Sequence, residues 1–142
     1  MSAVVLDTNI VLDLYVFGDA VSQPLALALE EGGLHWLATQ AMRDELARVL
    51  DYAQIAPRLA YYALDAAAVL ARFDRQARLV DPPAKAPVTC ADADDQKFID
   101  LAVAYGALLL SKDKDVLSMR KRLSVHGVRA QSAMDLIAQE VL

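Results

Sequence analysis

The chain has 142 residues and a mass of 15.4 kDa, so a single domain over residues 1–142 is expected, burying about 68 to 70% of the unfolded surface. One cysteine, Cys90, and two histidines, His35 and His126, exclude a disulfide framework, a cysteine zinc site and a paired-histidine metalloprotease motif. The net charge of −5 argues against a nucleic-acid partner, unless an acidic cluster holds a metal.

In the first half of the chain, apolar periodicity predicts alternating strands and helices, the pattern of an α/β fold with a parallel sheet. Residues 3–6 are wholly apolar, as expected of a parallel strand buried on both faces, and a helix follows Asp7. Next come a helix capped by Ser22 that runs to Glu31, a strand over 34–38, and a helix capped by Thr39 that runs to Leu50.

The second half of the chain continues the same alternation. Pro57 starts an alanine-rich helix over 58–75, followed by a strand over 78–80 and a proline-containing loop over 81–91. A helix begins after Asp92 and ends at Gly106. A strand over 107–111, a short basic helix, a strand near Val128 and a terminal helix from Ser132 complete the chain.

The acidic residues are mostly aspartate: 15 of the 19 are Asp and only 4 are Glu. Short carboxylates suit helix caps, turns and the binding of hard cations. Asp7 ends the first strand, and ligands of open α/β sheets bind at the carboxyl ends of strands. The alternative is that Asp7 only caps the next helix, although Thr8 and Asn9 are equally suited to that role.

Glu45 lies at the border of the apolar stripe of its helix, whereas Asp44 points well away from it. A border acid has two structural alternatives to a function. It extends to solvent, or it pairs with Arg48 at i+3.

Asp95 is the acid with the clearest pattern, because it shares a helix face with Phe98, Ile99, Ala102 and Gly106. Gln96, Lys97 and Asp100 turn outward. Unpaired buried carboxylates usually bind a cation or change protonation, which favours a function for Asp95. The alternative is a capping box with Asp92. Asp92 and Asp94 suit a helix N-cap and first turn.

Asp113 follows the strand over 107–111 and, if both strands are parallel, lies at the same sheet edge as Asp7. Asp115 comes two residues later. The structural alternative is that Ser111 or Asp113 caps the short helix that follows. The placement of four acids permits them to converge at one edge of a parallel sheet. These acids are Asp7, Glu45, Asp95 and Asp113.

Three segments, VVLDTNIVLD, DELARVL and DADDQKFIDLAVAYGALLLSKDKDVL, together resemble the PIN domain, and more narrowly the toxin-like PIN proteins of bacterial toxin-antitoxin systems. The resemblance implies a three-layer α/β/α fold with a central parallel sheet of four or five strands. It also implies hydrolysis of RNA phosphodiesters with Mg²⁺ or Mn²⁺. By position, the family's acids correspond to Asp7, Glu45, Asp95 and Asp113, with auxiliary roles for Thr8, Asn9, Asp92, Ser111 and Asp115.

In this interpretation Asp7, Asp95 and Asp113 are direct or water-mediated metal ligands, and Glu45 holds a water molecule of the metal. Substrate binding is predicted for Lys112 and Lys114, which begin a basic stretch that continues at 120–122; a solvated helix face is the alternative. Lys112 stands where the family commonly has a small residue, and Ser111 where it commonly has Thr.

The expected partners are an RNA substrate, a cognate antitoxin protein and a second copy of the chain in a homodimer. The N-terminus has no export signal and no apolar run approaches the ~18 residues of a membrane span, so a cytoplasmic protein without membrane contact is expected.

Three rival functions come from other classes of protein. A receiver-type phosphoacceptor domain needs an acidic pair at the end of the first strand, where this chain has Asp7 alone. A dehalogenase-like phosphatase needs an Asp at the position of Asn9. A catalytically silent PIN-fold module that acts through protein partners is the third, and the four retained acids argue against it.

Overall fold

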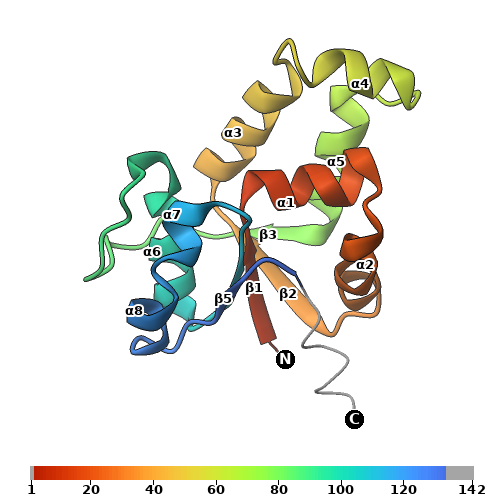
Figure 1. The fold of residues 1–142 in the computed structure, drawn as a ribbon. Coiled ribbons are helices and arrows are strands. Elements are labelled where there is room, and N and C mark those ends of the chain that lie inside the picture. Colours follow the sequence, from red (N-terminus) through yellow and green to blue (C-terminus); the bar gives the residue numbers. More distant parts are fainter. Residues whose placement is uncertain (1, 134–142) are drawn as a thin grey trace.

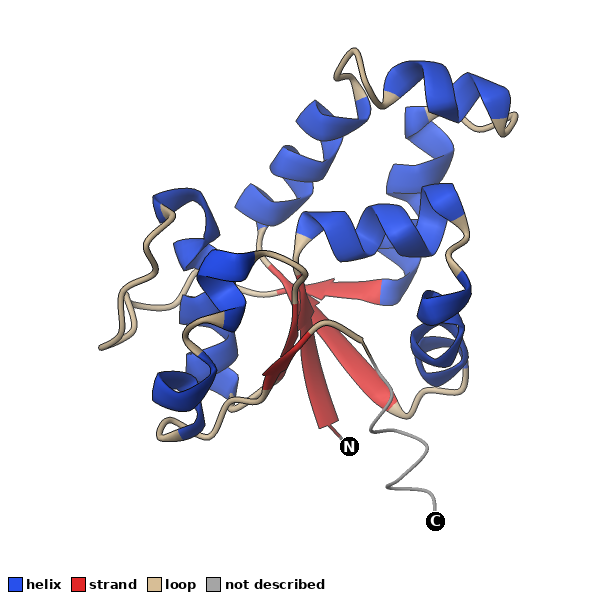
Figure 2. Ribbon diagram, viewed as in Figure 1, coloured by secondary structure: helices blue, strands red, loops and turns tan. Residues whose placement is uncertain are grey.

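The computed structural model of the chain describes residues 2–133 and has a five-stranded, all-parallel sheet with helices on both sides (Figures 1 and 2). The strand order is β3-β2-β1-β4-β5. The strands are β1 (Ser2–Leu6), β2 (Leu34–Ala38), β3 (Ala77–Leu79), β4 (Leu108–Leu110) and β5 (Ala130–Gln131). This arrangement confirms the predicted three-layer α/β/α fold.

The central strand β1 is buried because it has neighbours on both edges and helices on both faces. Val4 pairs with Trp36 of β2 and with Leu108 of β4, and Val4 and Val5 have no exposed surface. A wholly apolar strand therefore suits this position. The helices α6, α7 and α8 gather on one side of the sheet, and α1, α2 and α5 on the other (Figure 1).

The helices of the first half agree with the predicted ranges to within a few residues, but not with the predicted caps. Ser22 and Thr39 occupy N-cap positions without a side-chain cap bond, whereas the side chain of Asp19 accepts a bond from the Val21 amide at 3.1 Å. The helical elements are α1 (Thr8–Leu12), the π-helical turn η1 (Asp13–Phe17), the 3-10 turn η2 (Ala20–Ser22), α2 (Gln23–Glu30) and α3 (Gln40–Leu50).

The single long helix expected over 58–75 is wrong, because two helices stand there. These are α4 (Ala56–Tyr61) and α5 (Ala66–Gln76). The break lies at Ala63, whose φ of 56° is left-handed, and the Leu64 amide donates to the Leu59 carbonyl at 2.8 Å to close α4. Asp65 then caps α5 by accepting from the Ala68 amide at 2.7 Å. A helix end and a new helix start are thus encoded within three residues.

The second half contains η3 (Ala93–Asp95), α6 (Gln96–Tyr105), α7 (Lys114–Leu117) and α8 (Arg120–Ser124). The strand expected near Val128 begins at Ala130, because the Val128 amide donates to the Leu123 carbonyl at 3.1 Å and completes the end of α8. Gly127 has the positive φ of 78° that this ending requires. Beyond Ala133, the terminal helix expected from Ser132 lies outside the described residues.

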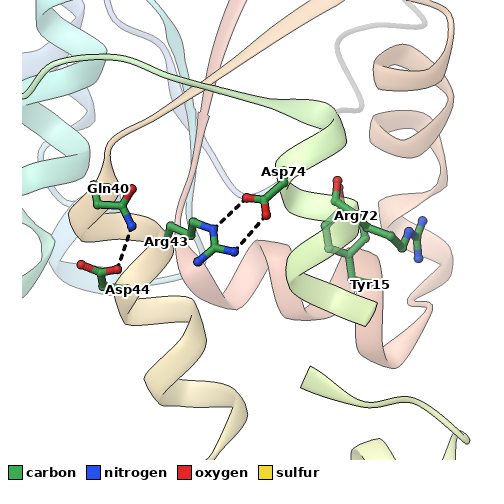
Figure 3. A network of polar contacts seen from close by, with 6 residues as sticks. All are labelled: Tyr15, Gln40, Arg43, Asp44, Arg72 and Asp74. Atoms are coloured by element: carbon green, nitrogen blue, oxygen red, sulfur yellow. Dashed lines mark hydrogen bonds and ion pairs between the residues drawn. The ribbon is translucent and has the colours of Figure 1, made fainter. Parts of the chain in front are cut away.

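Helix α3 is tied to α5, and α5 to η1, by contacts among side chains (Figure 3). Arg43 of α3 makes a two-bond ion pair with Asp74 of α5, at 2.7 and 2.9 Å, which lowers the pKa of the Asp74 carboxyl. The Arg72 guanidinium lies 4.3 Å from the ring centre of Tyr15. The Arg43–Asp74 pair thus joins α3, the helix that carries Glu45, to α5.

Within residues 2–133, no single helix has both the length and the apolar character needed to cross a membrane. One bent pair, residues 8–17 with 20–30 at 108°, passes the same test by length and composition.

Candidate metal centre

Asp7 and Ser111 follow the two central strands, and their side chains meet at the carboxyl end of the sheet. The Asp7 amide donates to the Leu110 carbonyl at 3.0 Å, so β1 and β4 end side by side. The Ser111 hydroxyl donates to Asp7 Oδ2 at 2.7 Å, and both residues are buried. Asp7 stands at the N-cap position of α1, where the Asn9 backbone amide of the first turn acts on its carboxylate, but the bond from Ser111 joins it to the neighbouring strand end.

Three carboxylates gather beside this pair, each offering one oxygen, with these oxygens within 4.8 Å of one another. They belong to Asp92, Asp95 and Asp113. Two of the three residues also shape the backbone: Asp92 accepts from the Asp94 amide at 2.9 Å, and Asp113 accepts from the Asp115 amide at 2.8 Å. Local turns therefore orient the carboxylates of Asp92 and Asp113.

Asp95 is the buried member of this acidic triad. Its residue is 8% exposed, and its Oδ2 atom has no hydrogen-bond partner among the described residues. The capping box with Asp92 is not formed, because the Asp92 side chain bonds to the Asp94 amide and the only bond between Asp95 and Asp92 in the described structure joins backbone atoms. A buried carboxylate oxygen without a donor is costly unless a cation satisfies it.

The pKa of Asp95 is raised to about 8, first by burial, then by a hydrogen bond with Asp113 and by the charges of Asp7, Asp113 and Asp92. Burial also raises the pKa of Asp7, whereas the Ser111 hydroxyl and the Asn9 backbone amide lower it. Like charges at short range thus disfavour ionisation of Asp7 and Asp95. A divalent cation bound beside these carboxylates would instead favour their ionised forms.

Glu45 reaches the same edge of the sheet from α3, and both of its oxygens have partners. The Thr8 hydroxyl donates to Oε2, and the Lys97 ammonium donates to Oε1 at 2.9 Å. The pairing with Arg48 that the sequence offered as an alternative is not made, because Lys97 of α6 takes that role. The Glu45 charge acts on Asp7, which places Glu45 at the edge of the acidic group.

The remaining predicted residues lie around this centre in different ways. Asn9 is exposed and contributes its backbone amide to Asp7. Asp115 is half-buried and is not one of the three clustered acids. Lys112 pairs with Asp13 at 2.5 Å, and the exposed Lys114 begins α7.

Sequence reasoning missed residues that it assigned to the outer face of α6. Gln96, Lys97 and Asp100 turn away from the sheet, yet they are half-buried because they contact other elements. Gln96 accepts from the Cys90 amide at 2.7 Å and Asp100 accepts from the Ala86 amide at 2.8 Å. These two side chains hold the end of the loop that leads to Asp92. The only sequence signal was their spacing of four residues on one helix face.

The arrangement of the triad suits a hard divalent cation, which prefers oxygen ligands. The donor set consists of carboxylates alone, and one of its oxygens is buried and unsatisfied. The residues present therefore fit a magnesium or manganese ion, and the acidic triad can hold a metal.

Comparison with known proteins agrees with this geometry. A family model described as a PIN domain matches residues 3–115. An uncharacterized protein of Methanocaldococcus jannaschii is 25% identical over 132 residues, a stretch that covers 88% of this chain and 81% of the relative. The range matched by the family model includes β1 from residue 3 onward, β2 to β4, Asp7, Glu45 and all three acids of the triad.

Proposed function

Because the chain belongs to the PIN domain family, whose members are generally nucleases, we propose that it is a Mg²⁺- or Mn²⁺-dependent endoribonuclease that hydrolyses RNA phosphodiesters. The observation that carries this proposal is the acidic triad of Asp92, Asp95 and Asp113 with its unsatisfied buried oxygen. The whole chain, residues 1–142, acts in this proposal as one catalytic domain.

We assign Asp95 and Asp113 as metal ligands, with Asp92 as an auxiliary ligand. Asp7 joins them directly or through water, because its carboxylate lies close enough for its charge to act on Asp95 and accepts the Ser111 bond at Oδ2. Each carboxylate oxygen can accept more than one bond. Asp115 shapes the start of α7 in this scheme and does not need to bind metal.

A bound divalent cation would supply charge stabilisation for the phosphoryl group and would activate water. The protein side chains perform the remaining tasks. Glu45, fixed by Thr8 and Lys97, orients the attacking water and accepts its proton at a carboxylate oxygen. Ser111 keeps the Asp7 carboxylate turned toward the triad. Loss of a proton from Asp95 prepares the site for the cation.

The direct test is an RNA cleavage assay with purified chain, using single-stranded and structured RNA with Mg²⁺, Mn²⁺ or EDTA. Cleavage is expected with either metal, and none is expected in EDTA or with Asp113→Asn. The exposed Asp51, at the far end of α3, provides the matched control Asp51→Asn, which should cleave normally. Equal cleavage in EDTA would refute the metal mechanism, and a folded, inert wild type would favour the silent binding module.

A toxin role within a toxin-antitoxin pair is the finer proposal, supported by the resemblance of the segments around Asp7, Glu45 and Asp95 to toxin-like PIN proteins. We call the acidic triad together with Asp7 and Glu45 the acidic centre. The antitoxin would inhibit by placing an Arg or Lys in this centre, where a guanidinium or ammonium satisfies the same carboxylates. Expression of the wild type should arrest growth, and Asp113→Asn should not. Normal growth with abundant, active wild type would exclude toxicity.

We also propose a homodimer, supported by large apolar side chains at the surface. Val21 is 60% exposed and Leu27 53% exposed on neighbouring elements, and Tyr61 of α4 is 83% exposed. Exposed apolar groups of this kind are common at interfaces. Light scattering at tens of micromolar should give twice the chain mass, and a clean monomer would remove the proposal.

A further inference from the structure

Lys97 places a positive charge at the border of a site that otherwise consists of carboxylates. Its ammonium donates to Glu45 Oε1 at 2.9 Å and to the Asp94 carbonyl at 2.5 Å. Asp94 lies between two acids of the triad in the chain, and the Glu45 charge reaches Asp7. The ammonium is therefore held between Glu45 and the backbone turn that carries Asp92 and Asp95.

The Lys97 side chain is fixed before any substrate arrives. Besides its two hydrogen bonds, the ammonium lies 4.8 Å from the ring centre of Phe98, which is fully buried. A lysine ammonium has three N–H donors, and these contacts use two of them. The side chain remains 26% exposed, and the third donor has no bond among the described residues.

Other described lysines have different neighbours. The Lys112 ammonium pairs with Asp13, and the Lys85 ammonium bonds within its own loop to Ala86 and Thr89. Among residues 2–133, Lys97 is thus the lysine whose ammonium bonds to a carboxylate of the acidic centre. A site for polyanionic RNA needs such a cation, because an uncovered carboxylate cluster repels phosphate.

We infer that Lys97 is a substrate-contacting residue, whose ammonium, held between Glu45 and Asp94, binds a non-bridging oxygen of an RNA phosphate at the acidic centre. This inference rests on the proposed ribonuclease function and adds a residue to it. It also assigns Glu45 a second task, since its carboxylate orients the ammonium that receives the substrate. A purely structural ion pair is the competing explanation, but partly exposed pairs contribute little to stability.

The test measures RNA binding rather than cleavage. Fluorescence anisotropy of a labelled single-stranded oligouridine is followed in Mg²⁺, with Asp113→Asn as the background so that the RNA stays intact. Adding Lys97→Met should weaken binding about tenfold, the effect of one charge-assisted hydrogen bond. The slope of log affinity against log salt should become shallower by about 0.7, the value for one lost phosphate contact on a single strand. Lys97→Arg should retain most of the affinity.

Arg75→Met is the matched control, because it removes one positive charge from an exposed position on α5, which packs on the other side of the sheet. It should leave both the affinity and the salt slope unchanged. Glu45→Gln keeps the ammonium but removes the charge that orients it, so RNA binding should weaken, by less than in Lys97→Met. A structural ion pair predicts instead that Lys97→Met and Glu45→Gln lower the melting temperature alike.

The outcomes separate this inference from the proposed function. Tight RNA binding with the same affinity and salt slope in Lys97→Met overturns the role of Lys97 and leaves the ribonuclease proposal standing. A folded protein that binds no RNA, with or without Mg²⁺, overturns both.

Discussion

Replacing Asp95 with asparagine is expected to stabilise the protein when no divalent cation is present. The pKa of Asp95 is raised from 3.8 to about 8, with burial as the main cause. Because the folded pKa lies above the unfolded one, the folded chain binds an extra proton between about pH 4 and pH 8. Stability is therefore lost as the pH rises through that window. Asparagine does not titrate, so the variant lacks this loss.

The size of the expected gain in stability follows from the shift in the pKa of Asp95. Each unit of pKa difference corresponds to about 1.4 kcal/mol, so the window from pH 5 to pH 8 sets an upper limit of about 4 kcal/mol. The hydrogen bond from Asp95 to Asp113 is part of the shift, and both Asp92 and Asp113 are half-buried, so solvent screening reduces the difference. We expect a gain for Asp95→Asn of roughly 1 to 2 kcal/mol at pH 8, and a melting temperature higher by roughly 3 to 8 °C. At pH 5 the gain should be small.

The assay compares thermal unfolding of wild type and Asp95→Asn at pH 5 and pH 8, in EDTA and in millimolar Mn²⁺. A ligand that binds only the folded state stabilises it by about 2.7 kcal/mol at a hundred times its Kd. Mn²⁺ should therefore stabilise the wild type more than the variant, so the difference between them narrows or reverses. The variant should also lose cleavage activity.

One result would refute this reasoning. If Asp95→Asn is less stable than the wild type by roughly 0.5 to 2 kcal/mol, equally in EDTA and Mn²⁺ and at both pH values, then the Asp95 carboxylate makes a stabilising contact that depends on neither metal nor charge. The most deeply buried acid of the triad would then leave the metal site.

Three further predictions concern residues that shape the site and the fold. Ser111→Ala removes the donor to Asp7, so the acidic limb of the cleavage pH profile should move to higher pH and urea unfolding should show a loss of about 1 to 2 kcal/mol. An unmoved limb would mean that Asp7 does not titrate in the reaction. Gln96→Ala frees the Cys90 amide, whose hydrogen exchange should accelerate roughly tenfold or more, while the Ala68 amide, bound to Asp65 at the start of α5, serves as the internal control. Ala63→Gly relieves a left-handed φ of 56° and should add about 0.5 to 1 kcal/mol, whereas Ala60→Gly inside α4 should remove a similar amount; equal losses in both would show that Ala63 is unstrained.

The family and the fold class could be predicted from sequence because they depend on patterns within single elements. The apolar run before Asp7 predicts a buried strand, and the spacing of Phe98, Ile99 and Ala102 directs Asp95 toward the core. Both residues are buried in the structure. The break in the helix over 58–75 was also present in the sequence, as Asp65 at a cap position, but alanine-rich neighbours concealed it.

Tertiary structure decided which side chains meet. Ser111 and Asp7 are 104 positions apart, and their bond exists because β4 lies next to β1 in the sheet. Glu45 bonds to Thr8 and Lys97, not to Arg48, because α3 and α6 converge at the same sheet edge. Periodicity fixes the direction of a side chain relative to its own element, whereas contact between elements depends on strand order and packing. For that reason the sequence indicated the acids individually, and only the fold assembled Asp92, Asp95 and Asp113 into a triad with Lys97 at its border.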